Sequence, residues 1–208
     1  MNREDFLIDY WKYYIMLEND FINKINNIKL SEDNYSVYSD EYVKQLQTIG
    51  SEFDVICRQV CECNNSDHTN ISNYADWIFK NVSDITLVKI NIRYQRVLQI
   101  EPFKGWKRDK PGELFWWSAY NCVKHNRTNN FSQGNLKNVL NALGALYYME
   151  MFLIKKIGSQ TDEIDVPNSF SKLFEICGWQ TRDTLMGDDV YAYRSEEIKA
   201  MFDEILKK

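Results

Sequence analysis

The sequence predicts a mainly α-helical protein, built as an antiparallel helical bundle around one core. Long segments repeat apolar residues at three- and four-residue steps, which places those residues on one face of a helix. Only 3 Pro and 8 Gly occur in 208 residues, too few for a turn-rich all-β fold. Apolar residues make up 44% of the chain, enough to fill one core. We therefore expect a single domain over residues 1–208.

The N-terminal part of the chain predicts two long helices and a short one. The long helices cover about 3–28 and 39–63, and a polar break separates them. The polar run 64–70 is expected to be a loop, and a short helix follows over about 71–81. The apolar stripes of the two long helices are marked by Phe6, Tyr10, Leu17, Phe21 and Ile25, and by Leu46, Ile49, Phe53, Ile56 and Val60.

Residues 85–103 form the part of the chain that least resembles a helix. They are rich in Ile, Val, Leu and Tyr, and polar and apolar residues alternate over part of the stretch. This pattern favours a small β-hairpin. Together with the loop that follows, it forms an insertion over 85–112.

The C-terminal half predicts two further long helices and an appendage. The helices cover about 113–127 and 135–157, and their short connection implies an antiparallel pair. Residues 3–63 and 113–157 would then form the helical core. Residues 158–208 form a C-terminal extension that is weakly patterned until a last amphipathic helix over about 195–206.

Composition also limits the function. The formal charge of −5 provides no global basic field for nucleic acid, so any RNA contact must come from a local patch. No stretch approaches 18 uncharged apolar residues, and no secretory leader is visible, so we expect no membrane association. Five cysteines, an odd number, suit a reducing compartment, and the chain is expected to be cytoplasmic.

Candidate catalytic chemistry is concentrated in the helix over 113–127. Trp117, Asn121, Lys124 and His125 stand at i, i+4, i+7 and i+8, which predicts a shared face, and Arg127 lies at the helix end. RNA can be cleaved without metal by an imidazole that moves protons while cations stabilise charge on the phosphate. The structural alternative makes His125 a hydrogen-bonded boundary residue and Asn121 an amide that satisfies a backbone group.

The same helix carries a pattern that extends into the next helix, which opens with Asn135-Leu136 and is rich in Ala and Leu. The pattern reads Trp116-Trp117-x-x-Tyr120-Asn121-x-x-Lys124-His125-x-Arg127. It resembles the HEPN superfamily, helical domains associated with prokaryotic toxin–antitoxin, abortive-infection and other defence systems. The resemblance is strongest over 113–157 and extends in part to 3–63. It covers neither the hairpin nor the C-terminal region.

The HEPN signature has an Arg, a polar residue just after it, and a His four to six residues downstream of the Arg. Asn121 matches the polar position and His125 matches the His, but Tyr120 stands where the Arg is expected. A tyrosine can donate a hydrogen bond but supplies no permanent cation to a phosphate. The departure puts catalysis in doubt and leaves open whether this chain is an enzyme.

The resemblance implies a homodimer with His125 near its interface, RNA as the ligand, and a cognate antitoxin or defence protein as partner. An active protein would be a metal-independent endoribonuclease from a bacterial defence or mobile-element system. His125 would then move the proton, Asn121 would orient it, and Lys124 and Arg127 would hold phosphate. The alternative is a non-catalytic HEPN-like dimerisation or interaction module, which Tyr120 favours. A helical scaffold with an accidental resemblance is a third interpretation.

Other residues are weaker candidates. The basic loop before the helix, with Lys104, Trp106, Lys107 and Arg108, suits an RNA backbone and one stacked base, unless Trp106 packs back on the core. Glu52 is a candidate partner for His125 or Lys124, with a solvated charge as the alternative.

The cysteines do not predict a metal site. Cys57, Cys61 and Cys63 lie near His68, but no second Cys/His pair completes a zinc motif. Cys57 and Cys61 are one helical turn apart, as reduced core thiols would be. We expect neither a metal nor a cofactor.

Overall fold

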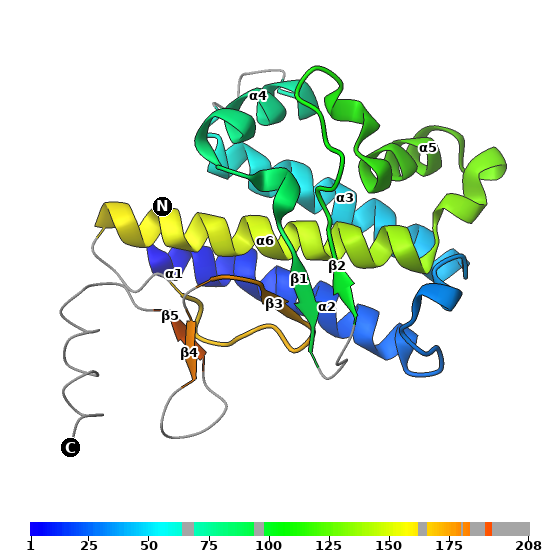
Figure 1. The fold of residues 1–208 in the computed structure, drawn as a ribbon, viewed down its shortest axis with the longest axis horizontal. Helices are drawn as coiled ribbons and strands as arrows, with labels where there is room; N and C mark the ends of the chain where they lie inside the picture. The colour runs from blue at the N-terminus through cyan, green and yellow to red at the C-terminus, as the bar shows by residue number, and fades with distance from the viewer. Residues whose placement is uncertain (64–68, 94–97, 162–165, 180, 184–189, 193–208) are drawn as a thin grey trace.

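The computed structural model describes residues 1–63, 69–93, 98–161, 166–179, 181–183 and 190–192. It is mainly helical with a small antiparallel sheet, as predicted (Figure 1). Five α-helices longer than one turn occur in these ranges: α2 (Lys12–Ile25), α3 (Asp40–Val60), α4 (Ile71–Asn81), α5 (Phe115–Asn130) and α6 (Leu136–Thr161). Short 3-10 helices lie at Glu32–Asn34, Ile85–Leu87, Pro111–Glu113 and Phe131–Gln133.

The predicted first helix is present but changes type along its length. It begins with α1 (Arg3–Phe6), passes through the π-helix η1 (Leu7–Trp11) and continues as α2. Asn2 starts it with a capping box, in which its side chain accepts from the Asp5 backbone N–H at 2.8 Å. The widened π turn is an irregularity that the three- and four-residue periodicity does not reveal.

Helices α2 and α3 run in opposite directions. Ser39 caps the start of α3 by accepting a hydrogen bond from the Tyr42 backbone N–H at 3.1 Å. From the first turn of α3, Tyr42 meets Phe21 near the end of α2, with ring centroids 6.5 Å apart. One turn further along α3, the Gln45 side chain donates to the backbone oxygen of Leu17 at 3.0 Å.

Helices α3 and α6 run in the same direction, so the expectation of an antiparallel bundle is wrong for this pair. A β-bridge joins Tyr38 to Asn135 just before the two helices begin. At their far ends, the Lys156 ammonium donates to the backbone oxygen of Val60 at 2.8 Å. The chain between them is long enough to travel back to the start of α3, and it carries α4, the hairpin and α5 (Figure 1).

The sheet contains the predicted hairpin and one strand that was not predicted. Strand β1 (Ile90–Ile92) pairs antiparallel with β2 (Gln99–Ile100) and, on its other edge, with β3 (Phe174–Ile176). Further along, β4 (Thr181–Asp183) and β5 (Val190–Ala192) form a separate pair. The helix expected over 195–206 lies outside the described residues.

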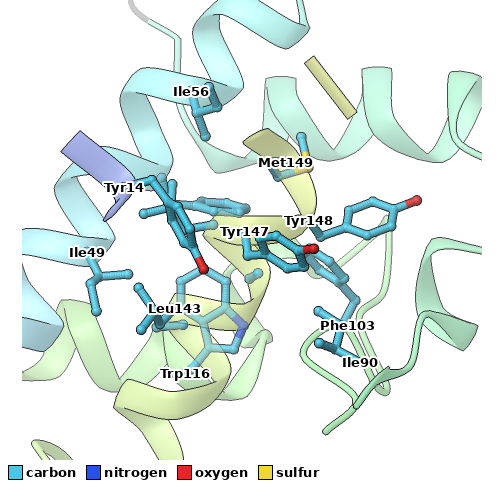
Figure 2. Packing of buried hydrophobic residues seen from close by; sticks show 14 of the residues in the cluster. Tyr14, Ile49, Ile56, Ile90, Phe103, Trp116, Leu143, Tyr147, Tyr148 and Met149 are labelled. Atoms are coloured by element: carbon cyan, nitrogen blue, oxygen red, sulfur yellow. The ribbon is translucent and has the colours of Figure 1, made fainter. Parts of the chain in front are cut away.

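Helix α6 is the centre of the core and is buried along nearly its whole length. Around it, Figure 2 shows aromatic and aliphatic side chains from several elements, including Tyr14 of α2, whose ring lies 5.6 Å from that of Tyr147. Trp116 of α5 is fully buried and donates its indole N–H to the Pro102 backbone oxygen at 2.8 Å. No helix in the described ranges is long and apolar enough to cross a bilayer.

Candidate functional site

Three of the four residues predicted to share a face of α5 line one hollow. Trp117, Asn121 and Lys124 border a space of about 340 Å³ between α5, α3 and the start of α4. His125 is exposed but is not among the lining residues. An α-helix turns by about 100° per residue. Around the α5 axis, an arc of about 100° contains the side chains of Tyr120, Lys124, Trp117 and Asn121, and His125 lies about 40° beyond that arc. The i+8 position is therefore at the margin of the face.

The opposite wall comes from α3 and was missed by the sequence analysis. Ser51, Asp54 and Arg58 line the hollow, and the Arg58 Nε donates to the Asp54 carboxylate at 3.2 Å. Arg58 also donates to the backbone oxygen of Thr69 at 3.3 Å, and the Tyr74 hydroxyl donates to Asp54 at 3.0 Å. Ser51, Asp54 and Arg58 stand at i, i+3 and i+7, a polar stripe that the sequence does contain.

Tyr120 lies in the contact between α5 and α3. Only 5% of its surface is exposed, and its ring lies 5.0 Å from that of Trp117. The ring packs so closely on Gly50 that a Cβ built there would lie 2.4 Å from the Tyr120 Cδ2. Lys124 places its ammonium 5.3 Å from the centre of the same ring. Tyr120 is therefore a packing residue that also supports a cation.

Asn121 uses its amide locally. Its Nδ2 donates to the Trp117 backbone oxygen, one turn earlier, at 3.1 Å. This is the arrangement of the structural alternative, in which the amide satisfies a backbone group. The described residues contain no hydrogen bond from Asn121 to His125.

The end of α5 presents exposed basic side chains. Lys124, His125 and Arg127 are all exposed, and no other described residue forms an ion pair with any of them. Asn126 interrupts the helix with φ −149° and ψ 66°, so His125 and Arg127 stand on either side of a break. The Asn130 amide donates to the Asn126 backbone oxygen at 2.8 Å, which holds the chain beyond this break.

The structure corrects the prediction that Trp106 of the basic loop stacks on a base. Trp106 is 3% exposed, donates its indole N–H to the Pro111 backbone oxygen at 3.0 Å, and packs against Phe103 and Phe79. Its ring is therefore a core side chain and is not available to stack on a base. This is the alternative in which Trp106 packs back on the core.

The cations of that loop are largely neutralised by nearby acids. Lys104 pairs with Glu101, and Arg108 pairs with Asp76 of α4 at 2.8 Å. Lys107 is exposed and has no acidic partner among the described residues. The loop thus offers much less free positive charge than its sequence indicates.

The structure also corrects the prediction that Glu52 is a partner of His125 or Lys124. The neighbours of Glu52 are not His125 or Lys124: its charge acts on Glu150 of α6 and on Tyr10 of η1, so it points to the other side of α3. Partial burial raises the pKa of the Glu52 carboxyl. Because helical neighbours two positions apart do not share a face, Asp54 takes the side towards α5.

The cysteines are free thiols. Cys57 and Cys61 are buried in α3 and at its end, and burial raises the pKa of Cys61 to about 12. Within the described ranges, no three His, Cys, Asp or Glu side chains are grouped to hold a metal ion. His68 lies outside those ranges.

Comparison of the chain with protein-family models, with curated proteins and with solved structures gives no match. The residues at the hollow and at the end of α5 are therefore the basis of the functional conclusion.

Proposed function

We propose that this chain is a HEPN-like RNA-binding protein that holds a strand along the α5 surface. The observation that supports the proposal is the free positive charge of Lys124 and Arg127 beside a polar hollow. Arg58, Arg108 and Lys156 are paired with carboxylates, whereas Lys124 and Arg127 stand three positions apart and neither has a carboxylate partner among the described residues. A chain with a net charge of −5 needs such a local patch to attract a phosphate backbone.

The hollow supplies polar groups that suit a single strand. Lys124 would contact a phosphate, while Ser51, Asn70 and Asn121 border the same space with hydroxyl and amide groups. Arg58 is held by Asp54 and Thr69, so its guanidinium is fixed at the wall of the hollow and its charge is balanced by Asp54. Trp117 lines the hollow with part of an otherwise buried indole, and sugar or base edges would contact it there.

His125 would give this surface a metal-independent ribonuclease activity. Its imidazole would accept the proton of a ribose 2′-hydroxyl as that oxygen attacks the adjacent phosphorus. The bond from phosphorus to the 5′-oxygen of the next nucleotide would break, and that oxygen would take a proton from water and leave as a hydroxyl. Lys124 and Arg127, on either side of it in the chain, would stabilise charge on the phosphate. The support for this role is that His125 is exposed, with Lys124 directly before it and Arg127 two positions after it in the chain.

The HEPN-like proposal also includes a homodimer, with a cytoplasmic role in a bacterial defence or mobile-element system and a cognate antitoxin or defence protein as partner. Its support is the residue pattern of α5 and the start of α6. A two-fold dimer through α5 would bring two basic ends together and enlarge the phosphate-binding surface.

The binding test is a titration of fluorescently labelled single-stranded RNA, followed by anisotropy at several salt concentrations. Lys124→Ala and Arg127→Ala should each weaken binding, and each should reduce the slope of log K against log salt by about 0.7. Lys29→Ala is the matched control, since Lys29 is an exposed cation beyond the end of α2 and has no acidic partner among the described residues. Equal losses for all three variants would refute the assignment to α5.

The cleavage test compares wild type and His125→Ala on a panel of RNAs with EDTA present. Metal-independent cleavage that is lost in the variant, while the oligomeric state is unchanged, would establish the ribonuclease. Equal cleavage by both proteins, or none by either, would end the case for His125 as the catalytic base.

A second candidate is the non-catalytic HEPN-like interaction module. The buried packing of Tyr120 against Gly50 favours it, because the position expected to hold a catalytic Arg is used to join two helices. This candidate predicts no cleavage, and it predicts that substitutions of exposed α5 residues change dimerisation or partner binding. Sedimentation of wild type and His125→Ala distinguishes it from the ribonuclease.

A further inference from the structure

Two glutamates are fully buried in the part of the chain that the structure describes, and their surroundings are opposite. Glu18 of α2 accepts hydrogen bonds from the Tyr14 and Ser171 hydroxyls and from the Lys172 and Leu173 backbone N–H groups. Glu150 of α6 is 0% exposed, and neither of its carboxyl oxygens has a hydrogen-bond partner among the described residues. An unsatisfied polar group of this kind requires a physical explanation.

The position of Glu150 is fixed by the parallel packing of α3 and α6. These helices are aligned at Tyr38 and Asn135 before they begin and at Val60 and Lys156 near their ends. This register brings Glu52 of α3 level with the turn of α6 that holds Glu150. Figure 2 shows Met149 of that turn and Ile56 of α3 within the same apolar cluster.

The third side of this junction is the π-helix η1. Tyr10 of η1 is half-buried, and the charges of both Glu52 and Glu150 act on its hydroxyl. Asp9, the other charged residue that acts on Tyr10, is also an acid. Within the described part of the chain, the side chains that act electrostatically on Glu150 and Tyr10 are therefore all acidic.

A carboxylate without a cation or a hydrogen-bond donor is unstable in such a place. Transfer from water into an apolar environment disfavours the ionised form strongly, and a second carboxylate beside it disfavours that form further. Both effects raise the pKa of Glu150, burial most and the charge of Glu52 next. The neutral acid is compatible with tight packing, whereas two ionised carboxylates would repel each other across the helix contact.

We propose that Glu52 and Glu150 form a proton-binding site that holds η1 against α3 and α6. One proton is bound on the Glu150 carboxyl in the closed junction, which keeps that group neutral beside Glu52. When that proton leaves to solvent, both carboxyls are ionised and Tyr10 faces two anions. The N-terminal helix then separates from α3 and α6 at η1, where the π turn already departs from regular helical hydrogen bonding.

The first test follows the glutamate side-chain carbons of the wild-type protein by NMR as pH is raised. The Glu150 resonance should titrate well above the ordinary carboxyl range, and Glu52→Gln should move that titration to lower pH. Because the wild type is measured directly, the result does not require a tolerated substitution at Glu150. An ordinary titration of Glu150 would overturn the proposal.

The second test measures hydrogen exchange of the η1 amides in wild type and in Glu150→Gln, which cannot lose a proton at this position. The measured quantity is the ratio of η1 protection factors in wild type and in Glu150→Gln at the same pH. This ratio should fall at least tenfold as pH is raised through the Glu150 titration. Amides in the middle of α5 serve as the internal control and should keep a constant ratio. A constant ratio in η1 as well would show that the pair does not control the junction.

Discussion

Replacing Gly50 by alanine tests how closely α5 approaches α3. In a regular exposed helix this change stabilises by about 1 kcal/mol, because alanine is the better helix former. Here the new Cβ would lie 2.4 Å, 2.5 Å and 2.7 Å from three atoms of the Tyr120 ring. Carbon atoms in contact prefer a separation of about 3.5–4.0 Å, so the ring must move by about 1 Å or more.

Tyr120 has little room to make that movement. Its ring is buried between Gly50 and Trp117 and supports Lys124. Overpacking of a buried site costs about 1–3 kcal/mol, which exceeds or cancels the gain in helix propensity. We expect Gly50→Ala to lower the free energy of unfolding by up to about 2 kcal/mol and to weaken RNA binding through the displaced Lys124.

Urea denaturation of four proteins measures this effect: wild type, Gly50→Ala, Tyr120→Ala and the double variant. Once Tyr120 is truncated the clash is absent, so the coupling between the two substitutions should exceed about 1 kcal/mol. Gly112→Ala is the control, since a Cβ there meets nothing within 4 Å. A Gly50→Ala protein as stable as wild type, with additive substitutions, would refute the close contact.

Four further changes test other parts of the structure. Glu18→Gln should lower the free energy of unfolding by about 2 kcal/mol or more in urea titrations. The new amide nitrogen is itself a donor and would face the hydroxyl and backbone N–H groups that now donate to the carboxylate. Trp106→Ala should cost about 3–5 kcal/mol in the same assay, as expected of a core indole. A thiol reagent at neutral pH should label exposed Cys122 quickly and Cys61 only on unfolding, as mass spectrometry of digests would establish. Burial raises the pKa of Glu150, so the folded state retains a proton that the unfolded state has lost above pH about 4.5. The free energy of unfolding should therefore fall as pH rises from about 4.5 through the folded pKa, by up to about 1.4 kcal/mol per pH unit. Glu150→Gln should not show this slope.

The helices could be predicted because their signals are local. The apolar repeats of α3 and α6 identify their buried faces, and Asn70 begins α4 with a capping box where the polar loop ends. Strand β3 could not be found in this way, since it is short and its partner β1 lies far away in the sequence. The common direction of α3 and α6 was missed for a related reason, because it depends on the path of the whole intervening chain.

The candidate site was predicted on one wall only. The spacing of Trp117, Asn121 and Lys124 correctly groups them on α5. The α3 wall was missed because Glu52 and Asp54 both interrupt the apolar pattern of α3, and the sequence does not distinguish which of them faces α5. Only the rotation of α3 relative to its neighbours decides which of the two faces α5, and that rotation is a property of the packed structure.

The parallel alignment of α3 and α6 has a consequence for folding during synthesis. Helices α2 and α3 leave the ribosome early and can pair with each other as a local helical hairpin. The face of α3 that α6 covers stays uncovered until residues up to about 160 have been made. Contacts of such large sequence separation slow folding, and the exposed apolar face is prone to aggregate or to recruit a chaperone in the interval. A nascent chain arrested after α5 should therefore remain protease-sensitive in α3, and one arrested beyond α6 should acquire protection in α3 and α6 together.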